Sequence, residues 1–443
     1  MPLGNFINLL FPNISVYIII FIYVFVIYFC LFRKYIFSLY DPAFFLCFVS
    51  SAFATSTVIF LYYFKQIDYI YFFNYCATLI TFYLAFFIFA KKVPTRNLIA
   101  KHKISKNNQF STQINETYFT IFFIFTLFHI LHQLYIYLTA GIPLFMESRL
   151  TITLSEGIVT AFFSRIIGLF TIPAGLMCYY VIFFGKKWKK IYAFFYLFLL
   201  LFFSFLSGSK GAILNLFFTF SVFIFFTQNY NRTGIKILKS KIIFVLLLFI
   251  ILLALLTISI QINQNLFGAI NHLILRFSAY GDGYVYAYPN DNILKVEKLS
   301  LVDFIFGDFL HTFRLSSSKR PQGYGFNLMD LAHCVENSIS GPNPRFNLVG
   351  YSYFGFLGSL ILSFIAGGIF AFSRNLLLSS VDKTALIQIR NYYIYQLLCS
   401  VESDIPAVII NITTNLFLQV IILLFFILIL YGAKKKKNSY VLN

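Results

Sequence analysis

The fold class is decided by stretches such as residues 14–32, ISVYIIIFIYVFVIYFCLF, which contain no charged side chain. A helix of about 20 mainly apolar residues is long enough to cross the hydrocarbon layer of a membrane. We expect eleven such segments, near 14–32, 43–64, 69–90, 117–139, 158–184, 191–207, 211–227, 242–260, 348–372, 384–400 and 405–431. The sequence therefore predicts an all-α polytopic membrane protein, with residues 1–443 forming a single integral membrane domain.

The composition excludes a soluble protein. Of the 443 residues, 60% are hydrophobic and only 11% are charged, whereas soluble domains contain about 45–50% apolar and about 25% charged residues. The six cysteines show no C-x-x-C spacing, so we expect neither a zinc site nor a disulfide framework. The first apolar segment lacks the basic start and the small-residue cleavage site of a signal peptide, and we interpret it as a transmembrane helix.

The distribution of Lys and Arg predicts the orientation. The connections after segments 1, 3, 5, 7, 9 and 11 hold 22 cations and three acids, and the positive-inside rule places such connections in the cytoplasm. The net charge of +19 is then a topology signal and not a sign of nucleic-acid binding. This orientation makes residues 261–347 one large periplasmic loop, and it places the N-terminus outside.

The basic connections contain no motif for an ATP- or nucleotide-sugar-driven reaction. They lack G-x-x-x-x-G-K-[ST], G-x-G-x-x-G and D-x-D. We therefore expect no cofactor, and we expect any chemistry on the other side. The 261–347 loop is far longer than a simple connection, and such long loops are usually functional.

One segment of this loop is a candidate catalytic site. Residues 327–337 read as a short helix on which Asp330, His333 and Glu336 recur every three residues and share one face. A histidine beside a carboxylate is the usual general base for deprotonating a hydroxyl group. The alternative is that these side chains form the polar face of an amphipathic loop helix.

Other motifs have two interpretations each. The turn at 207–211 offers backbone amides and Lys210 to an anion, or it is a tight turn whose lysine reaches the membrane surface. His129 and His132 have metal-ligand spacing, but hydrogen bonding between helices is the better explanation for them. The tyrosines at 280–288 suit sugar stacking or a membrane-surface belt. We interpret the glycines of residues 350–368 as helix-packing positions.

Several of these features, taken in order, resemble one enzyme family. Gly141-Ile-Pro-Leu-Phe followed by Arg149, the turn Ser207-Gly-Ser-Lys-Gly211, and Asn343-Pro-Arg-Phe-Asn-Leu-Val-Gly-Tyr-Ser-Tyr-Phe-Gly-Phe-Leu-Gly358 running into Ala366-Gly-Gly368 are similar to the Wzy-type O-antigen, or oligosaccharide repeat-unit, polymerases. The family usually shows Ser-Arg-Gly where this chain has Ser-Lys-Gly at 209–211. It often has an arginine before the aspartate where this chain reads Glu402-Ser-Asp404.

The resemblance implies a metal-independent glycosyltransferase of the bacterial inner membrane with its active site facing the periplasm. Such an enzyme joins undecaprenyl-diphosphate-linked oligosaccharides, which serve as donor and acceptor, into O-antigen or a similar surface polysaccharide. Membrane lipids surround it, and a chain-length regulator protein is a further partner that the resemblance allows. Planar guanidinium groups suit a diphosphate. The candidate diphosphate-binding cations are Arg149, Arg276, Arg345, Lys210 and Arg314.

Two alternatives remain open. An O-antigen ligase would use the same chemistry with a different acceptor. A flippase or transporter of the same lipid-linked oligosaccharide would more naturally show inverted repeats and cations inside central segments, whereas only Arg165 and Arg390 lie inside the apolar segments of this chain.

Overall fold

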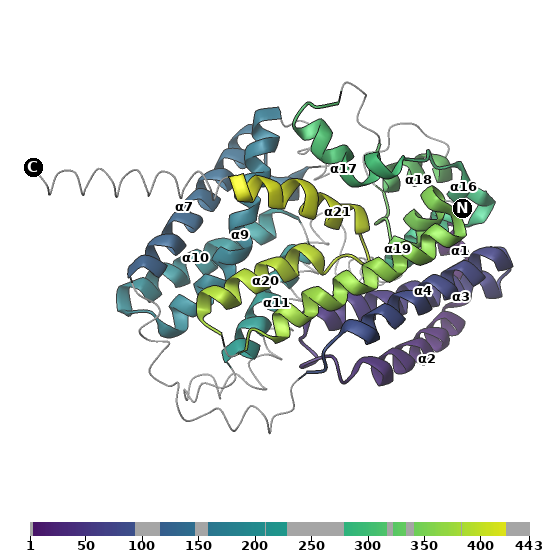
Figure 1. The fold of residues 1–443 in the computed structure, drawn as a ribbon, viewed down its shortest axis with the longest axis horizontal. Coiled ribbons are helices and arrows are strands. Elements are labelled where there is room, and N and C mark those ends of the chain that lie inside the picture. Colours follow the sequence, from purple (N-terminus) through teal and green to yellow (C-terminus); the bar gives the residue numbers. More distant parts are fainter. Residues whose placement is uncertain are drawn as a thin grey trace, which may run out of the picture.

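The computed structural model describes residues 3–93, 116–146, 158–208, 210–227, 279–316, 322–333, 341–381 and 383–421. Within these ranges the protein is helical throughout, with no β-strand (Figure 1). Helices are favoured here because each satisfies its own backbone hydrogen bonds, which lipid cannot do. The prediction of an all-α membrane protein is confirmed at this level.

The first group of helices contains both the start of the chain and a late segment. Its elements are α1 (Leu3–Leu10), α2 (Ile14–Phe32), η1 (Phe44–Val49), α3 (Ser50–Tyr63), α4 (Tyr69–Phe89) and α19 (Phe346–Leu378). Aromatic rings form much of its core. The rings of Phe32 and Phe48 stack 4.1 Å apart, and those of Phe82 and Phe346 lie 4.8 Å apart. Figure 1 shows α19 running alongside α4.

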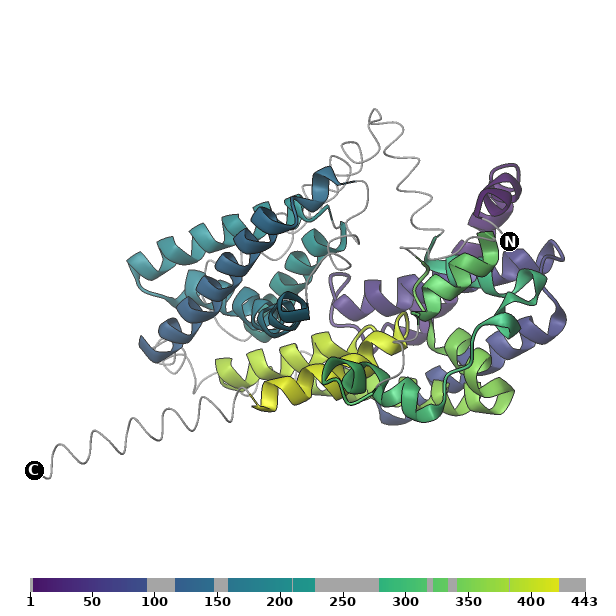
Figure 2. The same ribbon diagram turned by 90° about the horizontal axis from the view of Figure 1, so that it is seen from above.

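The second group is formed by the middle of the chain. Its elements are α7 (Glu116–Thr139), η2 (Pro143–Phe145), α9 (Ile158–Phe184), α10 (Lys187–Leu206) and α11 (Lys210–Thr227). Figure 2 shows these helices side by side, apart from the first group. Helix α20 (Ala385–Leu398) packs against both α9 and α19, so it joins the two groups. The Tyr180 hydroxyl donates to Gln388 Oε1 within this junction.

Among the described residues, six helices are long and apolar enough to cross a membrane: Ile14–Phe32, Phe44–Tyr63, Tyr69–Phe89, Glu116–Phe145, Lys187–Leu206 and Phe346–Leu378. Shorter apolar helices cover Phe170–Phe184, Gly211–Thr227 and Ile405–Ile421. The predicted segment 242–260 lies outside the described residues. The chain is therefore a polytopic membrane protein by length and composition of its helices, and the total of eleven stays a prediction.

The described part of the predicted 261–347 loop consists of short helices. They are η4 (Ala279–Gly281), α15 (Asp282–Ala287), η5 (Pro289–Asp291), α16 (Asn292–Lys295), α17 (Leu301–Thr312) and α18 (Tyr324–His333). Helix α15 packs against α3, and α18 packs against α15 and α16. A Cβ atom on Gly281 would lie 2.4 Å from Thr57 Oγ1, so this glycine lets the segment approach α3 closely. Tyr284 and Tyr288, which belong to this segment, are buried.

Helix α19 reverses direction at Gly355. This residue has φ 69° and ψ −166°, which is not a helical conformation. Gly350 and Ser359 face each other across the reversal, since a Cβ on Gly350 would lie 2.8 Å from Ser359 Cα. Phe82 of α4 contacts both Phe346, before the reversal, and Gly367, after it. The segment is thus a helical hairpin, with a short first arm (346–354) and a second arm (356–378) that is about 34 Å long.

The ends of several helices meet at one end of the molecule. Val93 N donates to the carbonyl of Lys34 at 3.1 Å, and Lys91 N donates to Asn375 Oδ1 at 2.7 Å. In the second group, Lys189 pairs with Glu116 at 2.8 Å. These residues belong to connections that the charge count assigns to a common side. We call the end where residues 33–42, 90–93 and 374–381 meet the basic end; that it faces the cytoplasm remains a prediction.

Candidate functional site

The predicted catalytic segment is a helix in the described part, as expected. Asp330 and His333 both lie on α18, three residues apart. Asp330 Oδ2 accepts a hydrogen bond from Gln322 Nε2 at 2.8 Å. His333 lies against Tyr286 of α15, with ring centroids 5.7 Å apart, and its buried Nε2 has no hydrogen-bond partner among the described residues. Glu336 lies outside the described residues.

This cluster is far from the basic end. Tyr324, at the start of α18, shares a hydrogen bond of 2.8 Å with Ser352 of the short first arm of α19, next to the reversal at Gly355. The basic end lies at the other end of the second arm. Burial raises the pKa of Tyr286 to about 12, so its phenol keeps its proton at neutral pH. His333 thus has a neutral aromatic neighbour.

The predicted diphosphate-binding cations are not gathered at one place among the described residues. Arg149 and Arg276 lie outside those residues. Lys210 is the first residue of α11, after the turn in which Gly208 has φ 60°. Arg314 is exposed just after α17 and has φ 54°. The role of all five cations therefore stays a prediction.

Arg345 is buried, with 3% of its surface exposed, and it precedes the first arm of α19. Its Nε donates to the Tyr280 carbonyl at 3.1 Å, its Nη2 donates to Ser50 Oγ at 2.7 Å, and its Nη1 forms an ion pair with Glu402. The guanidinium of Arg345 is thus hydrogen-bonded to protein groups in this structure, and a phosphate would have to displace one of them.

Glu402 is a site residue whose role the sequence left open. It lies in the turn between α20 and α21 (Ile405–Ile410), and 2% of its surface is exposed. Its Oε1 accepts from Arg345 and, at 2.8 Å, from the Ser51 hydroxyl. Asp404 caps α21 by accepting from Ala407 N at 3.0 Å. The available signal was that Glu402 and Asp404 are the only acids after residue 382.

A second buried ion pair holds the basic end together. Asp41, which is fully buried, accepts from both Nη1 and Nη2 of Arg374. The backbone N–H groups of Phe37 and Ala43 also donate to its carboxylate, at 2.9 and 3.0 Å. The pair ties the connection after α2 to the end of α19. In the sequence, Asp41 and Arg374 contributed only to the charge count that predicts the orientation.

A third ion pair joins the second helix group to α17. Arg165 of α9 binds Asp308 of α17 through two hydrogen bonds of 2.8 and 3.0 Å. Thr414 of η6 (Asn411–Asn415) donates to the same carboxylate at 2.9 Å. Arg165 therefore connects α9, α17 and η6, and it lies before Phe170–Phe184, the apolar part of α9.

Of the two histidines of α7, His129 makes the interhelical hydrogen bond that the sequence favoured. His129 Nδ1 and the Tyr196 hydroxyl of α10 are 3.0 Å apart, so His129 hydrogen-bonds between helices. No group of three or more His, Cys, Asp or Glu side chains that could hold a metal ion occurs among the described residues.

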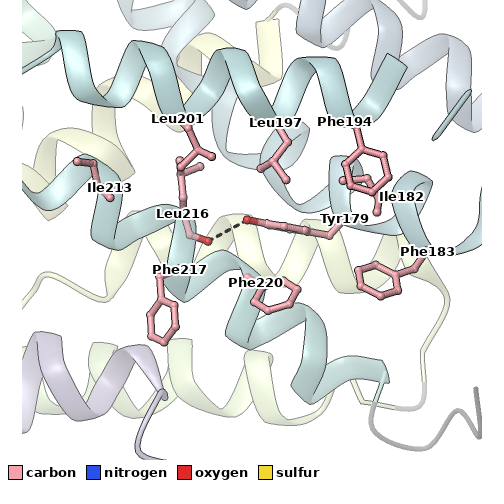
Figure 3. A pocket seen from close by; sticks show the side chains of 10 residues that line it. All are labelled: Tyr179, Ile182, Phe183, Phe194, Leu197, Leu201, Ile213, Leu216, Phe217 and Phe220. Atoms are coloured by element: carbon pink, nitrogen blue, oxygen red, sulfur yellow. Dashed lines mark hydrogen bonds between the residues drawn. The ribbon is translucent and has the colours of Figure 1, made fainter. Parts of the chain in front are cut away.

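An apolar pocket of about 260 Å³ lies between α9, α10 and α11 (Figure 3). Leu197, Phe220 and other apolar side chains line it. Tyr179 is the one polar side chain in the lining, and its hydroxyl donates to the Leu216 carbonyl at 3.2 Å. The pocket can hold hydrocarbon but offers no group for acid–base chemistry. Comparisons of the chain with protein-family models, with curated proteins and with solved structures find no match.

Proposed function

We propose that this protein polymerises lipid-linked oligosaccharide repeat units, with undecaprenyl-diphosphate-linked glycan as donor and acceptor, at the membrane face opposite the basic end. The reaction transfers the growing glycan from its lipid diphosphate to a hydroxyl of the next unit. The leaving diphosphate drives the transfer, so no nucleotide is needed. The polytopic helical structure supports this proposal, because such a donor is anchored in the bilayer.

The observation that carries the proposal is the cluster on α18. His333 is the candidate general base, and Asp330 on the same helix, with Glu336 beyond it, supplies carboxylates to orient it. Its Nε2 has no fixed partner among the described residues, so no protein group there competes for a proton. Because Nε2 is enclosed in this structure, the side chain must become accessible when substrate binds.

The test replaces His333 with Gln, which keeps a polar side chain but cannot take up a proton. A general base typically supplies about 10²- to 10⁴-fold in rate, so H333Q should reduce the surface glycan to single repeats at an unchanged protein level. H311Q is the matched control, since His311 lies in the same predicted loop on α17. Long chains in H333Q would refute the role of His333, and loss of chains in E336Q instead would assign the base to that carboxylate.

A flippase or transporter for the same lipid-linked glycan is the second candidate. Two interruptions of the helices favour it: α19 reverses at Gly355, and a buried turn separates α20 from α21. Discontinuous helices of this kind commonly form transport sites. A strain lacking the protein separates the functions. One repeat per acceptor indicates a missing polymerase, and no repeat indicates a missing flippase or ligase.

A further inference from the structure

Among the described residues, two arginine–carboxylate pairs are buried, and their carboxylates differ in how they are bonded. At the basic end, both oxygens of Asp41 are hydrogen-bonded, each to Arg374 and to a backbone N–H. In the other pair, Oε1 of Glu402 is bonded to Arg345 and Ser51, but Oε2 is buried and has no partner among the described residues. Buried polar atoms are almost always hydrogen-bonded, and exceptions call for a functional explanation.

The Arg345–Glu402 pair lies near the middle of the membrane helices. Phe346, next to Arg345, stacks on Phe82, and Phe82 also contacts Gly367, the midpoint of the second arm of α19. Because that arm is long enough to cross the hydrocarbon layer, the pair lies near the mid-plane of the membrane. Ionisable groups at this depth are costly and usually serve proton or ion movement.

A row of polar side chains leads from this pair to an exposed position. Asn347, two residues after Arg345, accepts from the Tyr284 hydroxyl at 2.8 Å. The rings of Tyr284 and Tyr288 are 5.5 Å apart, and Tyr288 stacks on Tyr71 at 5.2 Å. The Tyr71 hydroxyl donates to Asp291 at 2.5 Å, and Asp291 is exposed.

We call Asn347, Tyr284, Tyr288, Tyr71 and Asp291 the tyrosine row. Two of its polar atoms lack a hydrogen-bond partner among the described residues. The Tyr288 hydroxyl and Asn347 Nδ2 are buried without a hydrogen-bond partner among the described residues. Buried water commonly satisfies such atoms. Hydroxyl groups and bound water together can relay a proton, so the tyrosine row offers a route between Glu402 and the solution at the end opposite the basic end.

We propose that Glu402 is a proton-binding site, reached through the tyrosine row, and that proton uptake on Oε2 releases Nη1 of Arg345. A proton from water adds to the carboxylate and leaves a neutral carboxylic acid, while Arg345 keeps its positive charge. The charge of Glu402 is then lost, and Nη1 of Arg345 becomes available to an anion, while Nε and Nη2 keep their bonds to the Tyr280 carbonyl and Ser50 and Asp282 still interacts electrostatically with the guanidinium. The turn between α20 and α21 thereby loses its charged link to the start of α19, while the backbone hydrogen bond from Ile405 N to the Pro344 carbonyl remains. This proposal is independent of the glycan polymerase proposal.

The surroundings of Glu402 contain no second charged group that would replace Arg345 among the described residues. Asp404 precedes helix α21 and caps it by accepting from the backbone N–H of Ala407. The titratable or polar groups that face Glu402 from the packed elements are Arg345, Ser50, Ser51, Cys47, Tyr28, Tyr83, Tyr280 and Tyr284. Only the arginine among them is charged at neutral pH.

Infrared difference spectroscopy of the full chain in lipid nanodiscs tests the proposal, with protons and deuterons as the probe. As the pH falls from about 9 to about 4, a range in which carboxyl groups titrate, the wild type should gain one buried carboxylic-acid band that shifts in D₂O. E402Q should lose this band. D41N is the matched control, because it changes the other buried pair by the same chemistry, and it should keep the band.

A further variant tests the route. Y288F removes the open hydroxyl without changing the ring stack, and the band should then appear more slowly after a pH jump while keeping its final amplitude. If E402Q does not fold, D404N and D41N decide the question, because burial also raises the pKa of Asp404, to about 6. The buried carboxylic-acid band should remain in both variants. The proposal is overturned if the wild type shows no such band, or if D41N or D404N removes it. An unchanged rate in Y288F overturns the route.

Discussion

Gly355 allows a clean test of the hairpin, because its replacement by Ala changes the backbone energy and nothing else. Its φ of 69° and ψ of −166° lie in a region that essentially only glycine adopts. A Cβ atom there would meet no other atom within 4 Å, so no steric clash contributes. Holding a non-glycine residue in such a conformation costs about 1–3 kcal/mol. The ratio of folded to unfolded protein should fall about 5- to 140-fold.

The matched control is G168A in α9. Gly168 is helical and also has nothing within 4 Å of its Cβ position. Alanine is favoured over glycine in a helix by up to about 1 kcal/mol, so this variant should be as stable as the wild type or more stable. The assay is the free energy of unfolding in mixed detergent micelles. If G355A is as stable as G168A, the reversal at Gly355 is wrong.

Three further predictions concern packing, orientation and the candidate cations. G367A should be destabilised by about 1–3 kcal/mol through overpacking, because its Cβ would lie 2.2 Å from the Phe82 carbonyl oxygen. G368A is the control in the same unfolding assay. Its Cβ would have its nearest neighbour at 3.9 Å, so its stability should be close to that of the wild type. A reporter fused at Ser317 should be active only in the periplasm, and cytoplasmic activity would refute the orientation. Arg149, Arg276 and Arg345 should each be replaced by Lys, which keeps the charge but removes the bidentate fork. The glycan should become shorter, at an unchanged protein level, for each arginine that binds the diphosphate. Full-length polymer in all three variants would contradict their assignment.

The sequence predicted the parts of the fold that depend on composition. Long apolar runs indicate helices because lipid leaves the backbone no other partner, and α2, α4 and α7 begin and end close to the expected residues. Of the glycines expected to be packing positions, Gly350 and Gly367 are, because close neighbours surround both Cβ positions, whereas Gly355 has no atom within 4 Å of its Cβ position, so the expectation is wrong there.

The reversal at Gly355 could not be predicted in this way. The apolar run continues through it, so hydropathy shows one long helix where the chain has two arms. The Arg345–Glu402 pair was equally hidden, because its members are 57 residues apart and one sequence does not show which residues meet. The position of Arg345 beside an outer loop suggested exposure, whereas the hairpin brings it toward the centre of the helices.

The long separations within the two buried ion pairs also set an order of events during synthesis. Ribosomes add about 5–20 residues per second. Arg345 therefore enters the membrane about 3–11 seconds before Glu402, 57 residues later, is made. Asp41 waits about 17–67 seconds for Arg374, which follows 333 residues later. Only the first arm of the hairpin waits for a later residue, because Arg345 has no buried carboxylate partner until Glu402 is made, whereas Arg374 of the second arm meets an Asp41 that already exists.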